Sequence, residues 1–164
     1  MGRGYISFHL PESGREEGVL YSAFFDYKLA DGSKLHVMQE PAWCPNCQVF
    51  VVAEEVPTVE QLEQKIAWFR SLTPTDLGKW AVVSNGIPVE DQIADLRRYI
   101  AWRKERQSPP HCLECGCLNP IPVPQHGEFA HPGTGECVVA HGLKFAAAAP
   151  CYREFTPEGD PIGK

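Results

Sequence analysis

The chain has 164 residues, enough to bury a hydrophobic core without the help of disulfide bonds. Its formal net charge of −6 argues against wrapping nucleic acid or coating an anionic membrane, because both need dense positive charge. No apolar run reaches the roughly 18 residues of a membrane span, and the first residues lack the apolar core of a signal peptide. The seven cysteines are odd in number and clustered, which is typical of a reducing compartment. We therefore expect a cytoplasmic protein with no membrane attachment.

Three strands are expected in the first third of the chain, over residues 5–10, 19–29 and 48–53. In the second of these, large apolar side chains recur at every second position, which is the period of a strand with one buried face. The same face continues after Asp31-Gly32, a dipeptide typical of a tight hairpin turn. The third run is rich in β-branched residues and too short for a helix. These patterns predict that the first cysteine pair lies between strands.

Two helices are expected in the middle of the chain. The first begins at Thr58, which forms a capping box with Gln61 ahead of apolar residues at helical spacing. The second begins near Pro88, a residue suited to the first position of a helix, and continues to about Arg106. A short extended segment is expected between them, over residues 79–83. The two helices are predicted to form an antiparallel hairpin.

The last third of the chain is rich in proline and glycine. Residues 119–124 contain alternating prolines and are expected to cross the surface in an extended conformation. Residues 127–130 and 136–140 have the composition of two short strands joined by a turn, and residues 143–149 extend the same sheet. The polar, turn-forming tail over residues 156–164 is expected to pack loosely.

Two Cys-x-x-Cys pairs stand far apart in the sequence, Cys44 with Cys47 and Cys112 with Cys115. Two intervening residues let a tight turn aim both sulfurs of a pair at one ion about 2.3 Å away. Gly116, directly after the second pair, relieves crowding where backbone amides approach sulfur. Two such pairs supply the four thiolates of a closed tetrahedral site, so we expect these four cysteines to bind one metal ion.

This arrangement resembles the zinc-ribbon or zinc-knuckle class, in which two such pairs at the tips of β-hairpins hold one zinc ion. The resemblance favours zinc, although iron in rubredoxin-type sites uses the same four sulfurs. The 64 residues between Cys47 and Cys112 must form a structured insertion whose ends return together. We therefore expect an α+β fold. A small antiparallel β platform covers residues 1–56 and 107–164, a helical hairpin over residues 57–106 is inserted between the knuckles, and together they form one compact unit.

The first pair has an alternative interpretation, because thioredoxin-like proteins also carry a tryptophan before a Cys-x-x-Cys pair, as Trp43 does here. Thiol-disulfide exchange needs the first thiol at a helix N-terminus, where the helix dipole lowers its pKa. Since a strand pattern follows Cys47, and a second pair is present, the metal interpretation is favoured. The protein is accordingly not expected to be an oxidoreductase.

The remaining cysteines and histidines allow a second metal site near the C-terminus, but their explanation as buried thiols and turn histidines is favoured. Cys117 is expected to pack beside the first site rather than bind its ion, and His111 is expected to be an exposed loop residue. The candidates for a second site are Cys117, His131, Cys137, His141 and Cys151.

The sequence shows no phosphate-binding loop, nucleophile elbow or metalloprotease motif, so no active site is visible. A closed four-thiolate site also leaves no position for a substrate. We expect a non-catalytic module that binds another protein, with nucleic acid as the alternative partner through the basic end of the second helix. The candidate contact residues are Trp68, Arg97, Arg98, Trp102, Arg103 and Arg106.

Overall fold

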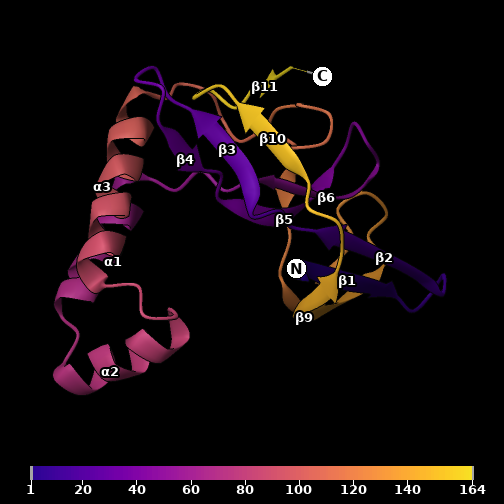
Figure 1. Cartoon of the computed structure of the whole chain (residues 1–164). Helices are drawn as coiled ribbons and strands as arrows, with labels where there is room; N and C mark the ends of the chain where they lie inside the picture. Colours follow the sequence, from indigo (N-terminus) through magenta and orange to yellow (C-terminus); the bar gives the residue numbers. More distant parts are fainter. Residues whose placement is uncertain (1, 164) are drawn as a thin grey trace. The chain divides into compact units, whose positions relative to one another are not determined.

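The computed structural model describes residues 2–163 (Figure 1). The chain divides into two compact units: a β-rich unit, made of the chain up to Glu55 and from Ser108 onward, and a helical unit over Val56–Gln107. The described residues form three helices and eleven strands in three sheets, so the fold is α+β, as the sequence predicts. Across residues 2–163, no helix has the length and apolar character needed to cross a bilayer.

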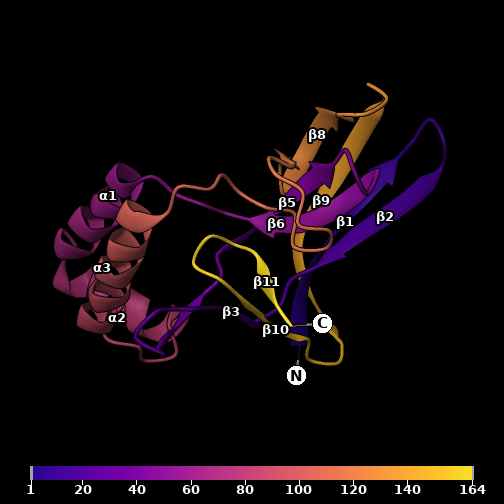
Figure 2. The ribbon, with the colours of Figure 1, turned by 90° about the horizontal axis from the view of Figure 1, so that it is seen from above.

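The first sheet of the β-rich unit has the strand order β2-β1-β9-β8, and every pairing in it is antiparallel. Its strands are β1 (Gly2–Leu10), β2 (Arg15–Leu20), β8 (His126–Ala130) and β9 (Cys137–Ala147). The predicted hairpin of the last third is therefore confirmed, and β9 extends it as expected. Figure 2 shows β1 and β9 running side by side through this sheet. Ile6, Phe8 and Leu10 of β1 are fully buried, at the period of two that a strand requires.

The second sheet has the order β11-β10-β3-β4. Its strands are β3 (Phe24–Lys28), β4 (Lys34–His36), β10 (Tyr152–Phe155) and β11 (Pro161–Ile162). The β3–β4 hairpin turns where the Asp31-Gly32 signal predicts it. The pairing of β3 with β10 is parallel, whereas the sequence predicts only antiparallel pairs. A parallel pair needs no turn signal, since its strands are joined through distant parts of the chain.

The single strand predicted over residues 19–29 is wrong, because β2 and β3 belong to different sheets. The chain leaves the first sheet at Ser22, which is 3% exposed. The Ser22 hydroxyl donates to the backbone carbonyl of Cys151 at 2.6 Å and accepts from the backbone amide of Phe24 at 3.2 Å. The side-chain amide of Gln39 bonds both the N–H and the carbonyl of Ser22. Hydrogen bonds of the Ser22 and Gln39 side chains take the place of strand pairing at this point. The alternation of apolar residues in the sequence gives no sign of this change.

The third sheet has the order β6-β5-β7 and carries the first cysteine pair. It comprises β5 (Gln39–Cys44), β6 (Val49–Glu54) and β7 (Ile121–Pro122). The first pair lies in the turn between β5 and β6, as predicted. The proline-rich segment is extended, also as predicted, and β7 docks on β5 opposite Trp43. Proline is tolerated there because β7 is an edge strand.

An aromatic cluster joins the first and third sheets. The ring of Phe8 on β1 stacks on Phe50 of β6, with 4.3 Å between their centroids. Trp43 and Phe129 meet the ring of Phe50 edge-on. His131 lies against Trp43 at a centroid distance of 4.2 Å. Aromatic packing of this kind adds about 0.5–1.5 kcal/mol per pair beyond the area buried, so it fixes the strands that carry Cys44.

The helical unit contains α1 (Val59–Arg70), α2 (Pro74–Val83) and α3 (Val89–Glu105). Helices α1 and α3 lie side by side in both views (Figures 1 and 2). The Thr58 capping box is present as predicted. The extended segment predicted over residues 79–83 is wrong, because it belongs to α2. Thr73 and Asp76 form a second capping box around Pro74, so the apparent helix break is a helix start.

The tail is not loosely packed, contrary to expectation. Gly159 is buried, and β11 continues the second sheet after it. The carboxyl group of Glu158 accepts hydrogen bonds from the backbone amide and the hydroxyl of Ser108, at 2.7 and 2.6 Å. The last residue of the predicted tail, Lys164, lies outside the described residues. The polar composition of the tail gave a wrong prediction of its packing, because hydrogen bonds rather than apolar side chains hold the tail in place.

Candidate metal centre

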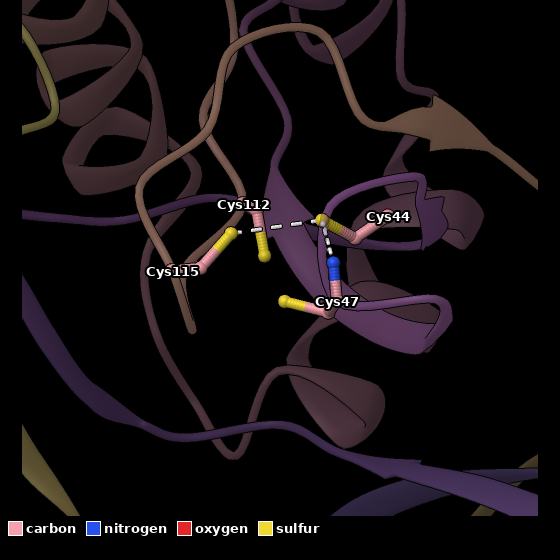
Figure 3. Close-up of side chains that lie close together, drawn as sticks. All are labelled: Cys44, Cys47, Cys112 and Cys115. Carbon is pink, nitrogen blue, oxygen red and sulfur yellow. Dashed lines mark hydrogen bonds between the residues drawn. The ribbon is translucent and has the colours of Figure 1, made fainter.

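The sulfur atoms of Cys44, Cys47, Cys112 and Cys115 all lie within 4.8 Å of one another. Figure 3 shows the four side chains converging from two sides, Cys44 and Cys47 from one turn and Cys112 and Cys115 from the other. The Cys44 and Cys115 sulfurs are 3.6 Å apart. Four sulfurs placed tetrahedrally at 2.3 Å from a zinc ion are about 3.8 Å from each other. The cluster therefore has the dimensions of a four-coordinate thiolate site.

Both turns have the same backbone geometry. The amide of Gln48 donates to the carbonyl of Cys44 at 2.8 Å, and the amide of Gly116 donates to the carbonyl of Cys112 at 2.8 Å. Gln48 and Gly116 follow their cysteine pairs directly, and both have a positive φ, +55° and +74°. Glycine takes this conformation freely, but a glutamine does so at a cost, and sequence reasoning identified only Gly116. The two turns thus share this hydrogen bond and this backbone conformation, although only the second has a glycine at the position.

Backbone amides also point at the sulfurs. The amide of Cys47 donates to the Cys44 sulfur at 3.3 Å. In the second turn, the backbone amides of Cys115 and Glu114 act on the Cys112 sulfur in the direction that lowers its pKa. Such donors stabilise a thiolate relative to a thiol. The backbone of each turn is thus arranged to favour charged sulfur, which is the form that binds metal.

Strand pairing, rather than the helical insertion, places the second turn beside the first. Ala53 of β6 forms a bridge with Cys112. The amide of Leu113 donates to the carbonyl of Val52 at 3.1 Å, and the amide of Glu54 donates to the carbonyl of His111 at 3.0 Å. Since β6 also follows the first turn directly, one strand supports both halves of the site.

The thiol pKa values differ strongly across the cluster. Burial raises the pKa of Cys112 to about 11 against its backbone hydrogen bonds, and burial together with neighbouring thiols raises the pKa of Cys47 and of Cys117. Burial also opposes ionisation of Cys115. There, however, hydrogen bonds from the Cys117 backbone, the Asn46 side chain and nearby thiols outweigh it and lower its pKa to about 6. Without metal, the cluster holds protons that a bound cation must displace.

Apolar side chains surround the base of the cluster. Cys44 and Cys112 are buried together with Ala42, Val51 and Ala53. Arg153 of β10 holds the second turn from the other side, since its guanidinium donates to the carbonyl of Leu113 at 2.6 Å. The same guanidinium lies 5.5 Å from the centroid of the Phe25 ring. Nothing in the sequence pattern singles out Arg153, because its partners lie far from it along the chain.

His111 is buried, with 4% of its surface exposed, so the expectation of an exposed loop residue is wrong. Its backbone amide and its Nδ1 atom both contact Oε2 of Glu54, at 2.8 and 3.0 Å. The other carboxyl oxygen of Glu54 accepts from the Tyr27 hydroxyl at 2.6 Å. These contacts hold His111, which precedes Cys112, in place, and they engage its Nδ1 atom.

Cys117 packs against the cluster, as expected. Its sulfur is 3.1 Å from that of Cys44, which is shorter than the separation of two ligands on one zinc ion. The backbone carbonyl of Cys117 accepts from the amide of Cys112 at 2.9 Å, closing the second turn. A fifth sulfur thus lies beside four that already suffice for a closed site.

The other histidines and cysteines do not assemble into a second group. Within residues 2–163, the four cysteines above are the one group of three or more potential ligands found close together. The Nδ1 atom of His131 accepts hydrogen bonds from the backbone amides of Gly133 and Thr134, at 2.9 and 3.1 Å. His131 therefore caps a turn, and Cys137, His141 and Cys151 remain outside any such group.

The candidate contact residues of the helical unit divide into exposed and buried ones. Trp68 is 53% exposed, whereas Trp102 is 5% exposed and Arg106 is 3% exposed. The guanidinium of Arg106 lies over the Trp102 ring at 5.2 Å, and Arg103 donates to the carbonyl of Pro57 at 3.1 Å. Arg97 and Arg98 are exposed. Three of the six residues thus serve interactions within the helical unit, and the exposed basic patch is smaller than expected.

Cys44 ends strand β5 and does not stand at a helix N-terminus, which the thioredoxin-like alternative requires. The chain matches no model in a scan of protein families, and searches of curated proteins and of solved structures give no match. Function is therefore inferred from the geometry of these residues alone.

Proposed function

We propose that the chain is a zinc-binding, non-catalytic interaction module. In this proposal, Cys44, Cys47, Cys112 and Cys115 bind one zinc ion that stabilises the β-rich unit, and the helical unit presents a surface to another protein. The observation that carries the proposal is the convergence of four sulfurs within 4.8 Å from two turns of the same backbone geometry.

A structural role for the ion is favoured over a catalytic one. Four protein ligands close a tetrahedral site and leave no position for water or substrate. Two of the cysteines, Cys44 and Cys112, are at most 1% exposed and lie on an apolar base. Zinc is preferred to iron because it has no redox chemistry and is the usual ion of closed cysteine sites.

The helical unit offers an apolar surface for the partner. Helix α2 has no buried residue. Val82 is 78% exposed and Val83 is 72% exposed, and a hollow of about 330 Å³ lies between α1 and α2. Exposed apolar surface of this kind often marks a site of interaction with another protein. The residues lining the hollow, hereafter the α2 surface, are Trp68, Leu72, Asp76, Lys79, Trp80 and Val83.

Metal content tests the first half of the proposal. We expect one zinc ion per purified chain by elemental mass spectrometry, and its loss together with a lower melting temperature in Cys44→Ser and Cys112→Ser. Cys137→Ser is the control, because Cys137 is a partly buried cysteine that stands outside the group of four. Substoichiometric zinc with stability unchanged in Cys44→Ser would refute the metal centre.

Affinity capture with paired variants tests the second half. Val83→Asp changes the α2 surface, while Arg98→Glu changes the exposed basic residues of α3 without touching that surface. A purified partner protein should lose binding to Val83→Asp and keep it with Arg98→Glu. The reverse result, with nucleic acid in the eluate and affinity falling steeply as salt rises, would favour the nucleic-acid alternative instead.

A further inference from the structure

The position of Cys117 points to a modification site that the metal centre does not require. Its sulfur is 3.1 Å from the sulfur of Cys44, closer than the 3.6 Å between Cys44 and Cys115. Two ligands of one zinc ion are about 3.8 Å apart, so Cys44 and Cys117 do not bind the same ion at this separation. The contact is that of a thiol beside a ligand sulfur.

We propose that Cys44 and Cys117 form a reversible disulfide bond when the protein meets a peroxide, and that this bond releases the metal ion. This inference rests on the proposed zinc centre, since it concerns what happens to one of its ligands. The sulfurs need to approach by about 1 Å to reach the roughly 2.05 Å of a disulfide bond.

The two cysteines differ in their access to solvent in the way that this reaction needs. Cys117 is partly exposed, whereas Cys44 is fully buried. Cys117 packs against the cluster without being one of the four proposed ligands, so a small peroxide can react at its partly exposed sulfur while the ion is bound, and Cys44 is in place as the second sulfur. Reversible oxidation at cysteines typically depends on a resolving cysteine of this kind next to the sulfur attacked.

The chemistry balances with hydrogen peroxide as the oxidant. The Cys117 thiol loses its proton and its sulfur attacks one peroxide oxygen, so an S–O bond forms, the O–O bond breaks and the other oxygen leaves as water. The Cys44 thiolate then attacks the Cys117 sulfur; an S–S bond forms, the S–O bond breaks and hydroxide leaves. The two sulfurs lose two electrons, which the peroxide gains.

Loss of Cys44 leaves three thiolate ligands on the ion. Cys44 belongs to the turn between β5 and β6, and its carbonyl and sulfur both accept hydrogen bonds from that turn. Oxidation therefore opens the site on the side of the first turn, and the ion becomes available to a competing chelator. Reduction of the disulfide restores the fourth ligand, which distinguishes this state from irreversible oxidation to sulfinic acid.

Reduced, zinc-loaded protein treated with hydrogen peroxide tests the inference. A chromophoric chelator follows zinc release, and peptide mapping by tandem mass spectrometry under non-reducing conditions identifies the cross-link. We expect a Cys44–Cys117 disulfide, release of zinc in step with it, and recovery of zinc binding after dithiothreitol. Cys117→Ser should keep one zinc per chain when reduced and release it several-fold more slowly. Cys151→Ser is the control and should behave as wild type, because Cys151 lies outside the cluster.

Any one of three outcomes would overturn the inference. The first is zinc release from Cys117→Ser at the wild-type rate, and the second is a set of cross-links that join only Cys44 to Cys47 or Cys112 to Cys115. The third is absence of zinc from reduced Cys117→Ser, which would identify Cys117 as a ligand. Cys117→Ala is measured as a second variant, and melting curves of both variants show whether they fold. Absence of zinc from the reduced wild-type protein would instead refute the proposed function. In that case, peptide mapping of the oxidised, metal-free protein would still show whether Cys44 and Cys117 form a disulfide bond.

Discussion

The carboxyl group of Glu54, which has no exposed surface, accepts a hydrogen bond of 2.6 Å from the hydroxyl of Tyr27. Tyr27 lies on β3 of the second sheet and Glu54 ends β6 of the third. The same carboxyl group bonds the backbone amide of His111, immediately before Cys112. One buried side chain thus joins two sheets to the start of the turn from Cys112 to Cys115.

Tyr27→Phe is expected to lower the free energy of unfolding by about 1–3 kcal/mol, because it removes a hydrogen bond to a fully buried carboxyl group. Tyr21→Phe is the matched control. The Tyr21 hydroxyl is buried and has no hydrogen-bond partner among the described residues, so its removal should be neutral or stabilising. Urea denaturation of the two variants compares them, and equal losses of stability would contradict the role assigned to the Tyr27–Glu54 bond.

Gly159→Ala is expected to be strongly destabilising. A Cβ atom at this position would lie 2.5 Å from Nδ1 of His111 and 2.6 Å from Oε2 of Glu54, and the backbone φ is +94°. Gly127→Ala provides the control, since Gly127 has a similar φ of +88° with nothing within 4 Å of the added atom. The control should cost only the backbone strain, about 1–2 kcal/mol.

Thermal unfolding separates the two glycine effects. If the two variants melt at the same temperature, the close approach of Gly159 to the buried Glu54–His111 pair does not contribute to stability. A larger loss in Gly159→Ala, accompanied by weaker zinc retention, would show that the tail supports the turn from Cys112 to Cys115.

The cluster of four cysteines was predictable from sequence because each of its halves is local. Two residues between cysteines determine the turn, and Gly116 indicates the backbone conformation that follows it. Gln48 takes the same conformation without being glycine, so the equivalence of the two turns was visible only in the structure. The residues around the cluster were not predictable, since Glu54, His111 and Gly159 meet from distant positions of the chain.

The secondary structure was predictable where one physical signal dominates. The Thr58 capping box and the hairpin of β8 and β9 are examples. Prediction failed where a local signal had two meanings. Thr73-Pro74 interrupts one helix but also begins the next, and the alternating residues of 19–29 conceal a change of sheet at Ser22. Only tertiary contacts decide such cases.

Glu40 should make stability depend on pH. Burial, followed by repulsion from Glu55, raises the pKa of Glu40 to about 7 in the folded protein from 4.5. The folded state therefore holds the Glu40 proton more tightly than the unfolded chain does. Its contribution to stability is fully present below about pH 4.5 and is lost as the pH rises through about 7.

Glu40→Gln removes this dependence, so we expect a higher melting temperature than wild type at pH 8 and a smaller difference at pH 5. Glu12→Gln is the control, because Glu12 is an exposed residue in the turn between β1 and β2. Melting curves measured across this pH range on metal-saturated protein compare the three chains. An equal gain in both variants at pH 8 would indicate a general effect of net charge rather than the burial of Glu40.

Arg153→Met is expected to weaken metal retention without removing a ligand. The guanidinium of Arg153 donates to the carbonyl of Leu113, which lies between Cys112 and Cys115, and its outer nitrogen is 3.6 Å from Glu114. Methionine preserves much of the side-chain stem over Phe25 but provides no donor, so the second turn loses its anchor to β10. Residues that orient metal ligands typically contribute about 10–100-fold to affinity, and we expect the rate of zinc transfer to a chelator to rise by about tenfold or more.

Lys34→Met is the matched control for this prediction. Lys34 belongs to the same sheet and forms an ion pair with Glu154 at 2.6 Å, so its substitution removes a positive charge while leaving the contact with Leu113 intact. Stopped-flow measurement of zinc transfer at fixed chelator concentration compares the two variants with wild type. Equal rates in Arg153→Met and Lys34→Met would mean that charge near the site, and not the hydrogen bond to Leu113, controls release. A faster rate in Arg153→Met alone would support the inferred role of β10 in holding the second turn against the ion.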